Sequence, residues 1–292
     1  MENIQHKHVE VRGLKLHVAE IGSGPKVVVF LHGFPEIWYT WRHQMVAVAN
    51  NGYRAIAFDF RGYGLSEQPA EPEKANFKDL VDDVVGLLDS LGTNKAFLVG
   101  KDFGAIPAYL VSAIHPERVS GVVTLGAPFI LPGPNAIQSI SFLRASTSQG
   151  GRSQGEQKQT FAALIDDQEI MDLFDPSTPL PPWFSEEDLS LYASLYEKSG
   201  FRFALQVPYR TLTVDIGIVN PKVAAPALLI MGEKDYALKL PGMVDYVRTG
   251  AVKTFVPDLD ITFLAEGCHF VHEQLPEQVN PLIITFLDKH SI

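Results

Sequence analysis

The chain has 292 residues, of which 46% are hydrophobic and 20% are charged, and its formal net charge is −10. It therefore lacks the basic surplus that neutralises nucleic-acid phosphates, and no apolar run approaches the ~20 residues that cross a bilayer. Cys268 is the only cysteine, which excludes an internal disulfide framework and a multi-cysteine metal site. The opening residues, 1–9, are too polar for a secretory signal. We expect a cytoplasmic protein that binds neither nucleic acid nor a membrane.

The pattern of apolar residues predicts an alternation of strands and helices. Two short alternating runs at 9–11 and 14–21 predict an antiparallel hairpin. Continuous apolar runs, typical of strands buried on both faces, lie at 26–31, 54–60, 95–100, 121–126, 227–231 and 261–264. Helical spacing predicts helices over 77–91, with Asn76 as its N-cap, and over 104–115. Buried strands that alternate with helices predict an α/β fold with a mostly parallel sheet.

The alternation stops after Phe129. Residues 130–215 contain no buried-strand run, but they hold helical patches at 161–174 and 186–198 that are separated by prolines. The simplest interpretation is a helical insertion between two strands of one sheet. We therefore predict a core formed by residues 1–129 and 216–292, with residues 130–215 as a helical lid.

The segment Leu98–Gly104 carries the most informative motif. A predicted strand ends at Gly100 and a helix begins near Gly104, with Asp102 between them. This is the strand–turn–helix context of a nucleophile elbow, with aspartate where many hydrolases have serine. Asp102 taken alone would be an ordinary helix N-cap.

Three further strand ends change that interpretation. The segment 30–36 follows the first buried strand, where backbone N–H groups can form an oxyanion-binding loop. Asp235 follows the strand at 227–231, and His269 follows the strand at 261–264. The order Asp102, Asp235, His269 is the order of nucleophile, acid and histidine in the α/β-hydrolase fold.

Other candidate sites in the sequence are weaker. Residues 151–155 match the serine-elbow pattern around Ser153, but no strand precedes them, so we interpret this stretch as a surface loop. Asp59 is better explained as a turn former than as a second catalytic acid. His272 and Glu273 do not have the further ligands that a zinc site needs, and we predict no metal and no cofactor.

The motifs resemble a known family. His32-Gly-Phe-Pro-Glu36, Trp41-Arg-His-Gln44, Asp59-Phe-Arg-Gly-Tyr-Gly64 and the Asp102 elbow are similar to those of the soluble epoxide hydrolases, particularly the plant type, in the α/β-hydrolase superfamily. Residues 183–201 and Tyr209-Arg210 also resemble the lid of that family. The resemblance implies the α/β-hydrolase fold and a small apolar epoxide as substrate, in a monomer or a homodimer.

The resemblance also implies a role for each motif residue. Asp102 would attack an epoxide carbon and form an alkyl ester, which water activated by His269 and Asp235 would then hydrolyse. The backbone N–H groups of Phe34 and Phe103 would hold the oxyanion. Tyr209 would donate a hydrogen bond to the departing alkoxide. We also predict that Phe129 and Phe270 form apolar walls of the pocket, although either could simply belong to the core.

Two departures from the family bear on turnover. A second lid tyrosine is expected near residues 138–142, where this chain has Ser139 or Phe142 instead. Lys101 replaces the histidine that usually precedes the nucleophile, and it could extend to solvent or pair with Glu36. The resemblance implies that Glu36 helps to place the hydrolytic water, so this pair would change the position of that water. If the pair forms, we expect the ester to form but to be hydrolysed slowly. This behaviour would suit a specialised substrate or an intramolecular, biosynthetic ring opening or cyclisation.

Two alternative functions stay open at this stage. A haloalkane-type dehalogenase would also use an aspartate nucleophile, but the Phe34 and Phe103 rings offer no N–H donor to a halide. A ligand-binding protein with little turnover would explain the missing tyrosine, but it would not explain why Asp102, Asp235 and His269 are all present. The identity of the substrate cannot be derived from these patterns.

Overall fold

In the computed structural model, which describes residues 3–134, 136 and 178–291, one sheet of eight strands forms the centre of the molecule. The strands are β1 (Gln5–Val11), β2 (Leu14–Ile21), β3 (Val27–Leu31), β4 (Arg54–Phe58), β5 (Ala96–Lys101), β6 (Val119–Leu125), β7 (Ala227–Gly232) and β8 (Leu259–Leu264). Their spatial order is β1-β2-β4-β3-β5-β6-β7-β8. The pairs β1–β2 and β2–β4 are antiparallel, and all the other pairs are parallel. The predicted hairpin and the mostly parallel sheet are therefore confirmed.

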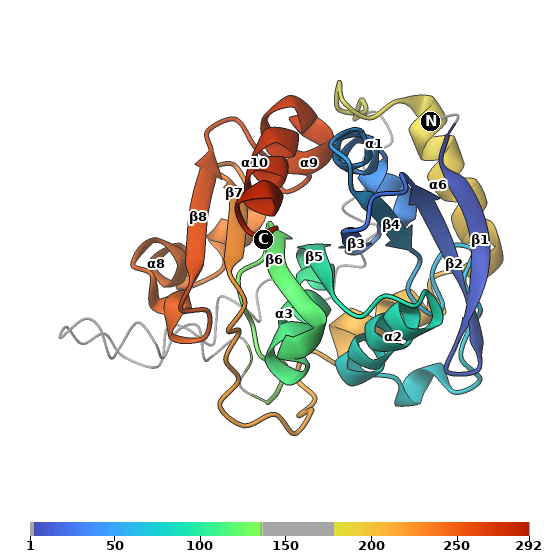
Figure 1. The fold of residues 1–292 in the computed structure, drawn as a ribbon, viewed down its shortest axis with the longest axis horizontal. Helices are drawn as coiled ribbons and strands as arrows, with labels where there is room; N and C mark the ends of the chain where they lie inside the picture. The colour runs from blue at the N-terminus through green and yellow to red at the C-terminus, as the bar shows by residue number, and fades with distance from the viewer. Residues whose placement is uncertain (1–2, 135, 137–177, 292) are drawn as a thin grey trace.

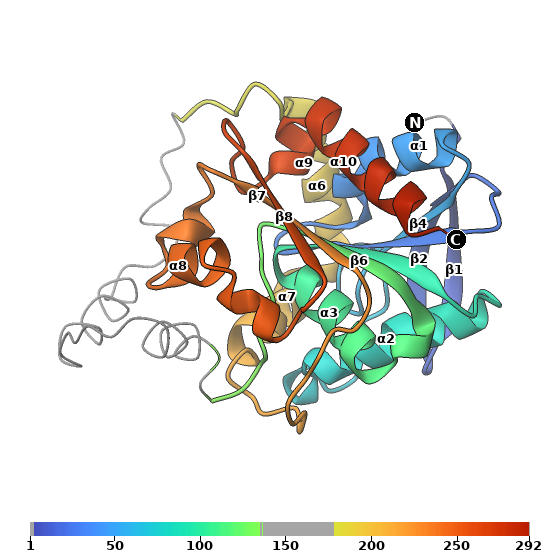
Figure 2. The ribbon, with the colours of Figure 1, turned by 60° about the vertical axis from the view of Figure 1, so that its left-hand side comes forward.

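Helices cover both faces of the sheet (Figures 1 and 2). The longer ones are α1 (Arg42–Asn50), α2 (Phe77–Ser90), α3 (Ala105–Ile114), α6 (Glu186–Ser199) and α10 (Pro276–Lys289), and the short ones are α7 (Arg202–Leu205), α8 (Met243–Arg248) and α9 (Val271–Gln274). Figure 2 shows α1 and α10 on one face and α2 and α3 on the other. The predicted N-cap of α2 is present, because the Asn76 side chain accepts from the Lys78 N–H, and Asp79 bonds back to the Asn76 N–H.

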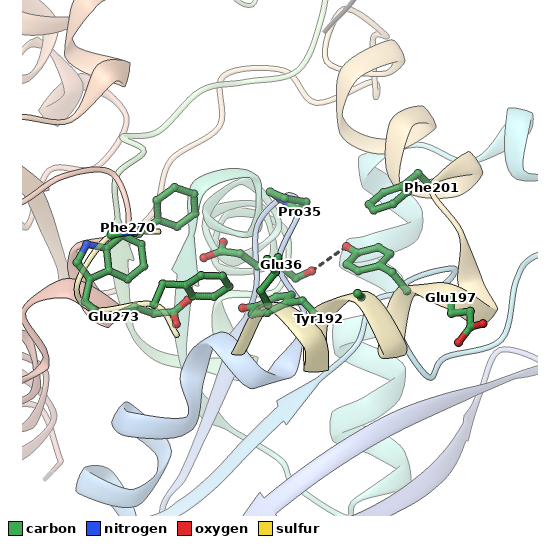
Figure 3. A pocket seen from close by; sticks show the side chains of 13 residues that line it. Pro35, Glu36, Tyr192, Glu197, Phe201, Phe270 and Glu273 are labelled. Carbon is green, nitrogen blue, oxygen red and sulfur yellow. Dashed lines mark hydrogen bonds between the residues drawn. The ribbon is translucent and has the colours of Figure 1, made fainter. Parts of the chain in front are cut away.

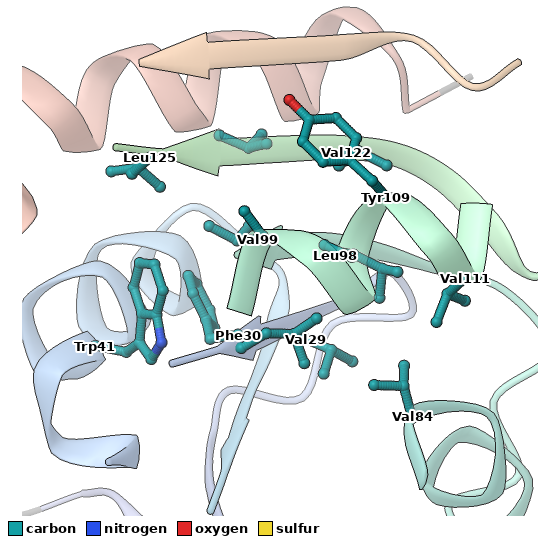
Figure 4. Close-up of a cluster of buried hydrophobic side chains, with 14 of the residues drawn as sticks. Val29, Phe30, Trp41, Val84, Leu98, Val99, Tyr109, Val111, Val122 and Leu125 are labelled. Atoms are coloured by element: carbon teal, nitrogen blue, oxygen red, sulfur yellow. The ribbon is translucent and has the colours of Figure 1, made fainter. Parts of the chain in front are cut away.

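The core lies between β3, β5 and β6 and the helices that cover them. Every residue of β3 and β5 is buried, as the continuous apolar runs predicted. Figure 4 shows Phe30 of β3 beside Trp41, and Leu98 and Val99 of β5 in the same buried cluster as Tyr109 and Val111 of α3. This packing holds rigid the strand ends that carry the candidate site.

Between β6 and β7, the described residues form α6, α7, a π-helical turn at Gln206–Arg210 and irregular segments. No strand occurs between these two strands in the described part of the chain. Much of the predicted lid, including residues 138–142 and Ser153, lies outside the described residues. The boundaries of core and lid therefore stay a prediction.

Candidate active site

A strained turn follows β5. The φ of Asp102 is +52°, in the left-handed region that side chains other than glycine rarely adopt. A Cβ on Gly104 would lie 2.3 Å from the backbone oxygens of Leu31 and His32. A Cβ on Gly100 would lie 2.5 Å from the Gly104 oxygen. Only glycine fits at these two positions, and together they allow the turn to present the Asp102 side chain at the carboxyl end of the sheet.

Three side chains from separate strand ends meet at this turn. His269 lies between two carboxylates, with Nδ1 2.8 Å from Asp235 Oδ1 and Nε2 3.1 Å from Asp102 Oδ2. Asp235 follows β7, and His269 follows β8. All three residues are therefore in hydrogen-bonding contact in the arrangement that the strand-end positions predicted.

The charges of these groups depend on one another. Burial opposes ionisation of Asp102, but the hydrogen bond from His269 and the charge of Lys101 outweigh it, so the pKa of the Asp102 carboxyl is lowered. Burial and the Lys101 charge lower the pKa of His269, but its bonds to Asp102 and Asp235 outweigh them, so that pKa is raised. Both ring nitrogens face acceptors, which favours an imidazolium beside an ionised nucleophile.

Two backbone N–H groups converge on the same carboxylate. The N–H of Phe34 donates to Asp102 Oδ1 at 3.1 Å, and the N–H of Phe103 also bonds the Asp102 carboxylate. Donors in this position can stabilise negative charge on an oxygen of an Asp102 ester.

Lys101 forms a buried ion pair beside the nucleophile. Its side chain has no exposed surface, and Nζ lies 3.1 Å from Glu36 Oε2 and 4.2 Å from the centroid of the Phe270 ring. Among the described residues, no group forms a well-aligned hydrogen bond with Nζ, so its polar contact is the ion pair with Glu36. Of the two alternatives left open for Lys101, the pair with Glu36 is therefore the one that forms.

Glu36 has further partners. It accepts from the Gly33 N–H at 3.2 Å and from the Thr40 hydroxyl at 2.9 Å. Burial raises the pKa of Glu36, although the charge of Lys101 opposes the rise. Lys101, Gly33 and Thr40 therefore occupy part of the capacity of Glu36 to accept a hydrogen bond from a water molecule.

A buried polar cluster continues from Glu36. The Thr40 hydroxyl lies 2.7 Å from both His272 Nε2 and Glu273 Oε1, and Arg42 pairs with Glu273 at 2.6 Å. Ligand atoms of Glu36, His272 and Glu273 lie within 4.8 Å of one another, as in some metal sites. The cations Lys101 and Arg42 already pair with the two carboxylates, which makes this arrangement a poor match for a metal.

Tyr209 lies beside the two residues whose N–H groups hold Asp102. Its ring is 5.1 Å from the Phe34 ring and 5.3 Å from the Phe103 ring, and 53% of the residue is exposed. Burial and the charge of Asp102 raise the pKa of Tyr209 to about 12. The predicted acid is thus next to the nucleophile and protonated at neutral pH.

An apolar cavity of about 610 Å³ adjoins the site. Figure 3 shows Tyr192 of α6 facing Pro35 and Glu36, with Phe270 and Glu273 at one end and Phe201 at the other. Asp102 itself does not line the cavity, but Glu36 connects the two: a Cβ on Gly33 would touch both Asp102 Cβ and Glu36 Oε2. The cavity therefore ends beside the nucleophile.

Some side chains have positions that differ from the sequence-based expectation. Phe270 lines the cavity as predicted, but Phe129 is only 1% exposed and packs on Tyr109 and Phe255, so it belongs to the core. Tyr192 of α6 also lines the cavity. Tyr236, whose ring packs on His269, was not identified from the sequence. Its position directly after Asp235 was the one sequence feature that could have pointed to it.

Comparisons with known proteins agree with this geometry. A family model described as the alpha/beta hydrolase fold matches residues 26–273. Epoxide hydrolase 3 of Siraitia grosvenorii is 34% identical over 319 aligned residues, covering 99% of this chain and 100% of that protein. Epoxide hydrolase B of Mycobacterium tuberculosis is 31% identical, covering 97% of this chain and 98% of that protein.

A solved structure is also similar over the whole chain. The crystal structure of an epoxide hydrolase from Vigna radiata superposes with a TM-score of 0.84 at 34% identity, covering 99% of both chains. The chain therefore belongs to the α/β-hydrolase fold family and, within it, to the epoxide hydrolases. Among the described residues, no helix is long and apolar enough to cross a membrane.

Proposed function

We propose that this member of the epoxide hydrolase family opens an epoxide ring through a covalent ester on Asp102. The observation that carries the proposal is the contact of His269 with both Asp102 and Asp235, on a turn strained to expose the Asp102 side chain. The lowered pKa of the Asp102 carboxyl supports this role, because a nucleophilic carboxylate must be ionised.

In the first half-reaction, a carboxylate oxygen of Asp102 attacks an epoxide carbon. The carbon–oxygen bond of the ring breaks, and its electron pair stays on the ring oxygen, which takes a hydrogen bond and then a proton from Tyr209. The position of the Tyr209 ring against Phe34 and Phe103 supports this role, because it keeps the phenol close to the nucleophile.

In the second half-reaction, water hydrolyses the ester. Once Asp102 is esterified, its negative charge no longer raises the pKa of His269, so the imidazolium releases its proton to solvent more readily and the neutral ring can act as a base. Asp235 holds the ring in place, and the Phe34 and Phe103 N–H groups stabilise the oxyanion formed by water attack.

The cavity supports an apolar substrate. Its walls include the aromatic rings of Trp183, Phe184, Tyr192, Phe201 and Phe270. Glu36 and Glu273 at its surface already pair with Lys101 and Arg42, so these two carboxylates do not select for a cationic substrate. We propose that the cavity accepts an apolar arm of the epoxide and that the segment with α6 and Tyr209 acts as the lid.

The Lys101–Glu36 pair favours slow release of the ester. The ion pair with Lys101 occupies part of the Glu36 carboxylate that could otherwise hold a water molecule. The hydrogen bonds from the Gly33 N–H and the Thr40 hydroxyl occupy a further part. This favours a specialised substrate, such as one opened in a biosynthetic ring opening, over rapid turnover of many epoxides. Ligand binding with little turnover is the second candidate, and the same pair supports it.

We further propose a cytoplasmic location, in a monomer or homodimer. A single, half-buried cysteine suits a reducing compartment, because the fold gains nothing from disulfides.

A single turnover in heavy-oxygen water tests the route. With enzyme in excess over styrene oxide, we expect the diol to carry ordinary oxygen and the Asp102 peptide to gain one heavy oxygen, detected by mass spectrometry. In His269→Gln, we expect the peptide to retain the mass of the alkyl ester. Labelled diol with an unlabelled Asp102 peptide would refute the ester route, and neither label nor diol with a panel of epoxides would favour ligand binding.

A further inference from the structure

The hydroxyl groups of the nine tyrosines fall into two classes. Seven hydrogen-bond to protein groups: Tyr39 to Asp188, Tyr53 to Asp288, Tyr63 to the Val207 oxygen, Tyr109 to Thr124, Tyr192 to Thr40, Tyr196 to the Glu36 oxygen and Tyr246 to the Phe129 oxygen. The other two, Tyr209 and Tyr236, have no hydroxyl partner among the described residues. These two phenols are available to a ligand.

Both free phenols lie at the nucleophile. Tyr209 packs against Phe34 and Phe103, whose N–H groups bond Asp102. Tyr236 packs against His269, with ring centroids 4.4 Å apart and planes inclined by 33°, and His269 bonds the other oxygen of Asp102. The two rings therefore approach the same carboxylate through different neighbours.

The position of Tyr236 is fixed by the site itself. It directly follows Asp235 and begins the 3₁₀ turn Tyr236–Lys239, in which Asp235 Oδ1 accepts from the Ala237 N–H. The side chain is nevertheless 55% exposed, a large fraction for a ring that packs on a buried histidine. An ordered ring with a free, accessible hydroxyl is what hydrogen bonding to a substrate requires.

Electrostatics agree with this placement. Burial raises the pKa of the Tyr236 phenol, and the charge of Asp102 is the next largest cause, with Tyr209 also contributing. The hydroxyl is therefore close enough to Asp102 and Tyr209 to be influenced by both. It stays protonated at neutral pH and can donate.

We propose that Tyr236 is a catalytic residue that donates a second hydrogen bond to the epoxide oxygen, together with Tyr209. The inference rests on the ester route proposed above and assigns the second acid to the loop after β7 rather than to the lid. As Asp102 attacks carbon, the ring carbon–oxygen bond breaks, and the alkoxide takes a proton from one phenol. The proton released when water hydrolyses the ester returns to that phenolate, so epoxide and water give the diol.

The charge on Asp102 couples the two events. Burial raises the pKa of both phenols, and the charge of the Asp102 carboxylate adds to this effect. When the ester forms, that charge disappears, and both phenols become stronger acids at the moment when the alkoxide needs a proton. Attack by Asp102 thus favours proton donation.

Half-reaction kinetics test the proposal. Tyr236→Phe keeps the ring on His269 and removes only the hydroxyl. With excess enzyme and styrene oxide, quenched samples analysed by mass spectrometry give the rates of ester formation and ester hydrolysis separately. We expect ester formation to slow by about 10- to 100-fold, because a general acid contributes about 10²- to 10⁴-fold and one donor remains. Ester hydrolysis should change by less than about 3-fold, because the Tyr236 phenol donates its hydrogen bond during ester formation and not during ester hydrolysis.

Two further variants complete the design. Tyr53→Phe removes a hydroxyl that bonds Asp288 near the chain end, and it should react like the wild type. The double variant Tyr209→Phe/Tyr236→Phe should form ester more slowly than either single variant. Equal losses in both half-reactions would assign Tyr236 a positioning role on His269 and overturn the proposal, as would ester formation at the wild-type rate.

The failure of the ester route would look different. In that case the wild-type chain itself would give no labelled Asp102 peptide, and both proposals would fall. A wild-type chain that forms ester, together with an unaffected Tyr236→Phe, would overturn the tyrosine assignment alone.

Discussion

The Lys101–Glu36 pair is the feature whose removal has the most specific consequence. The two charges are 3.1 Å apart, and neither side chain is more than 3% exposed. At an effective dielectric constant of about 20, the attraction at this distance is about 5 kcal/mol. Desolvation of both groups opposes this gain, so the pair contributes little net stability relative to apolar residues. Removing one partner is different, because the other charge stays buried and uncompensated.

We expect Lys101→Met to lower the free energy of unfolding by about 3–5 kcal/mol and Glu36→Gln to do the same. The methionine can pack on the Phe270 ring that the lysine covers, and the glutamine oxygen can still accept from one of the two donors, Gly33 or Thr40. The double variant carries no buried charge at this pair. Its loss should therefore be several kcal/mol smaller than the sum of the single losses.

Urea unfolding of the four proteins, followed by circular dichroism, measures this coupling. The exposed pair Lys78–Asp82, with 3.0 Å between charged atoms on α2, serves as the control. Its double-mutant cycle should give about 0.3–0.5 kcal/mol, because solvent screens the pair. Additive effects of Lys101→Met and Glu36→Gln, or single losses below about 1 kcal/mol, would refute the reasoning.

Three further predictions concern catalysis and the elbow. Asp235→Asn should slow ester hydrolysis by at least about 10²-fold while ester still forms, because His269 loses its orienting carboxylate; equal slowing of both half-reactions in quench experiments would argue against this division. In Lys101→Met, loss of a charge that lowers the pKa of His269 should raise that pKa. The half-maximal pH of ester hydrolysis should then move upward, and an unchanged or lowered pH would contradict the assignment. Gly104→Ala should lower the free energy of unfolding by about 1–3 kcal/mol, because its Cβ meets two backbone oxygens; wild-type urea unfolding would show that the turn tolerates a side chain.

The sequence was sufficient to predict the positions of the site residues that directly follow strands of the sheet. Asp102, Asp235 and His269 each follow a buried apolar run, and parallel strands bring their carboxyl ends to one edge of the sheet. The turn at Asp102 was also predictable, because flanking glycines mark a backbone that a Cβ would block. These inferences need only local patterns and the topology of the sheet.

Contacts that depend on loop conformation were not predictable. A lysine at the end of β5 could extend to solvent or fold inward, and the backbone of the Phe34–Glu36 loop decides between the two. Tyr236 has no periodic pattern around it, and its importance appears only when the ring is seen against His269. Phe129 was ambiguous because an apolar residue after a strand can face either the core or a pocket.

The polar cluster at Thr40 joins two distant parts of the chain. Arg42 and Gln44 bind Glu273 and the His272 backbone oxygen, which lie four and three residues after His269, the proposed base. During synthesis Asp102 leaves the ribosome long before His269 does. The segment that carries His269 then docks on Arg42 and Gln44, which are synthesised near the start of the chain. A chain that stops before this docking could carry Asp102 in its turn but, by the proposed mechanism, would lack the base that releases the ester. Complete synthesis is therefore a condition for turnover, not only for stability.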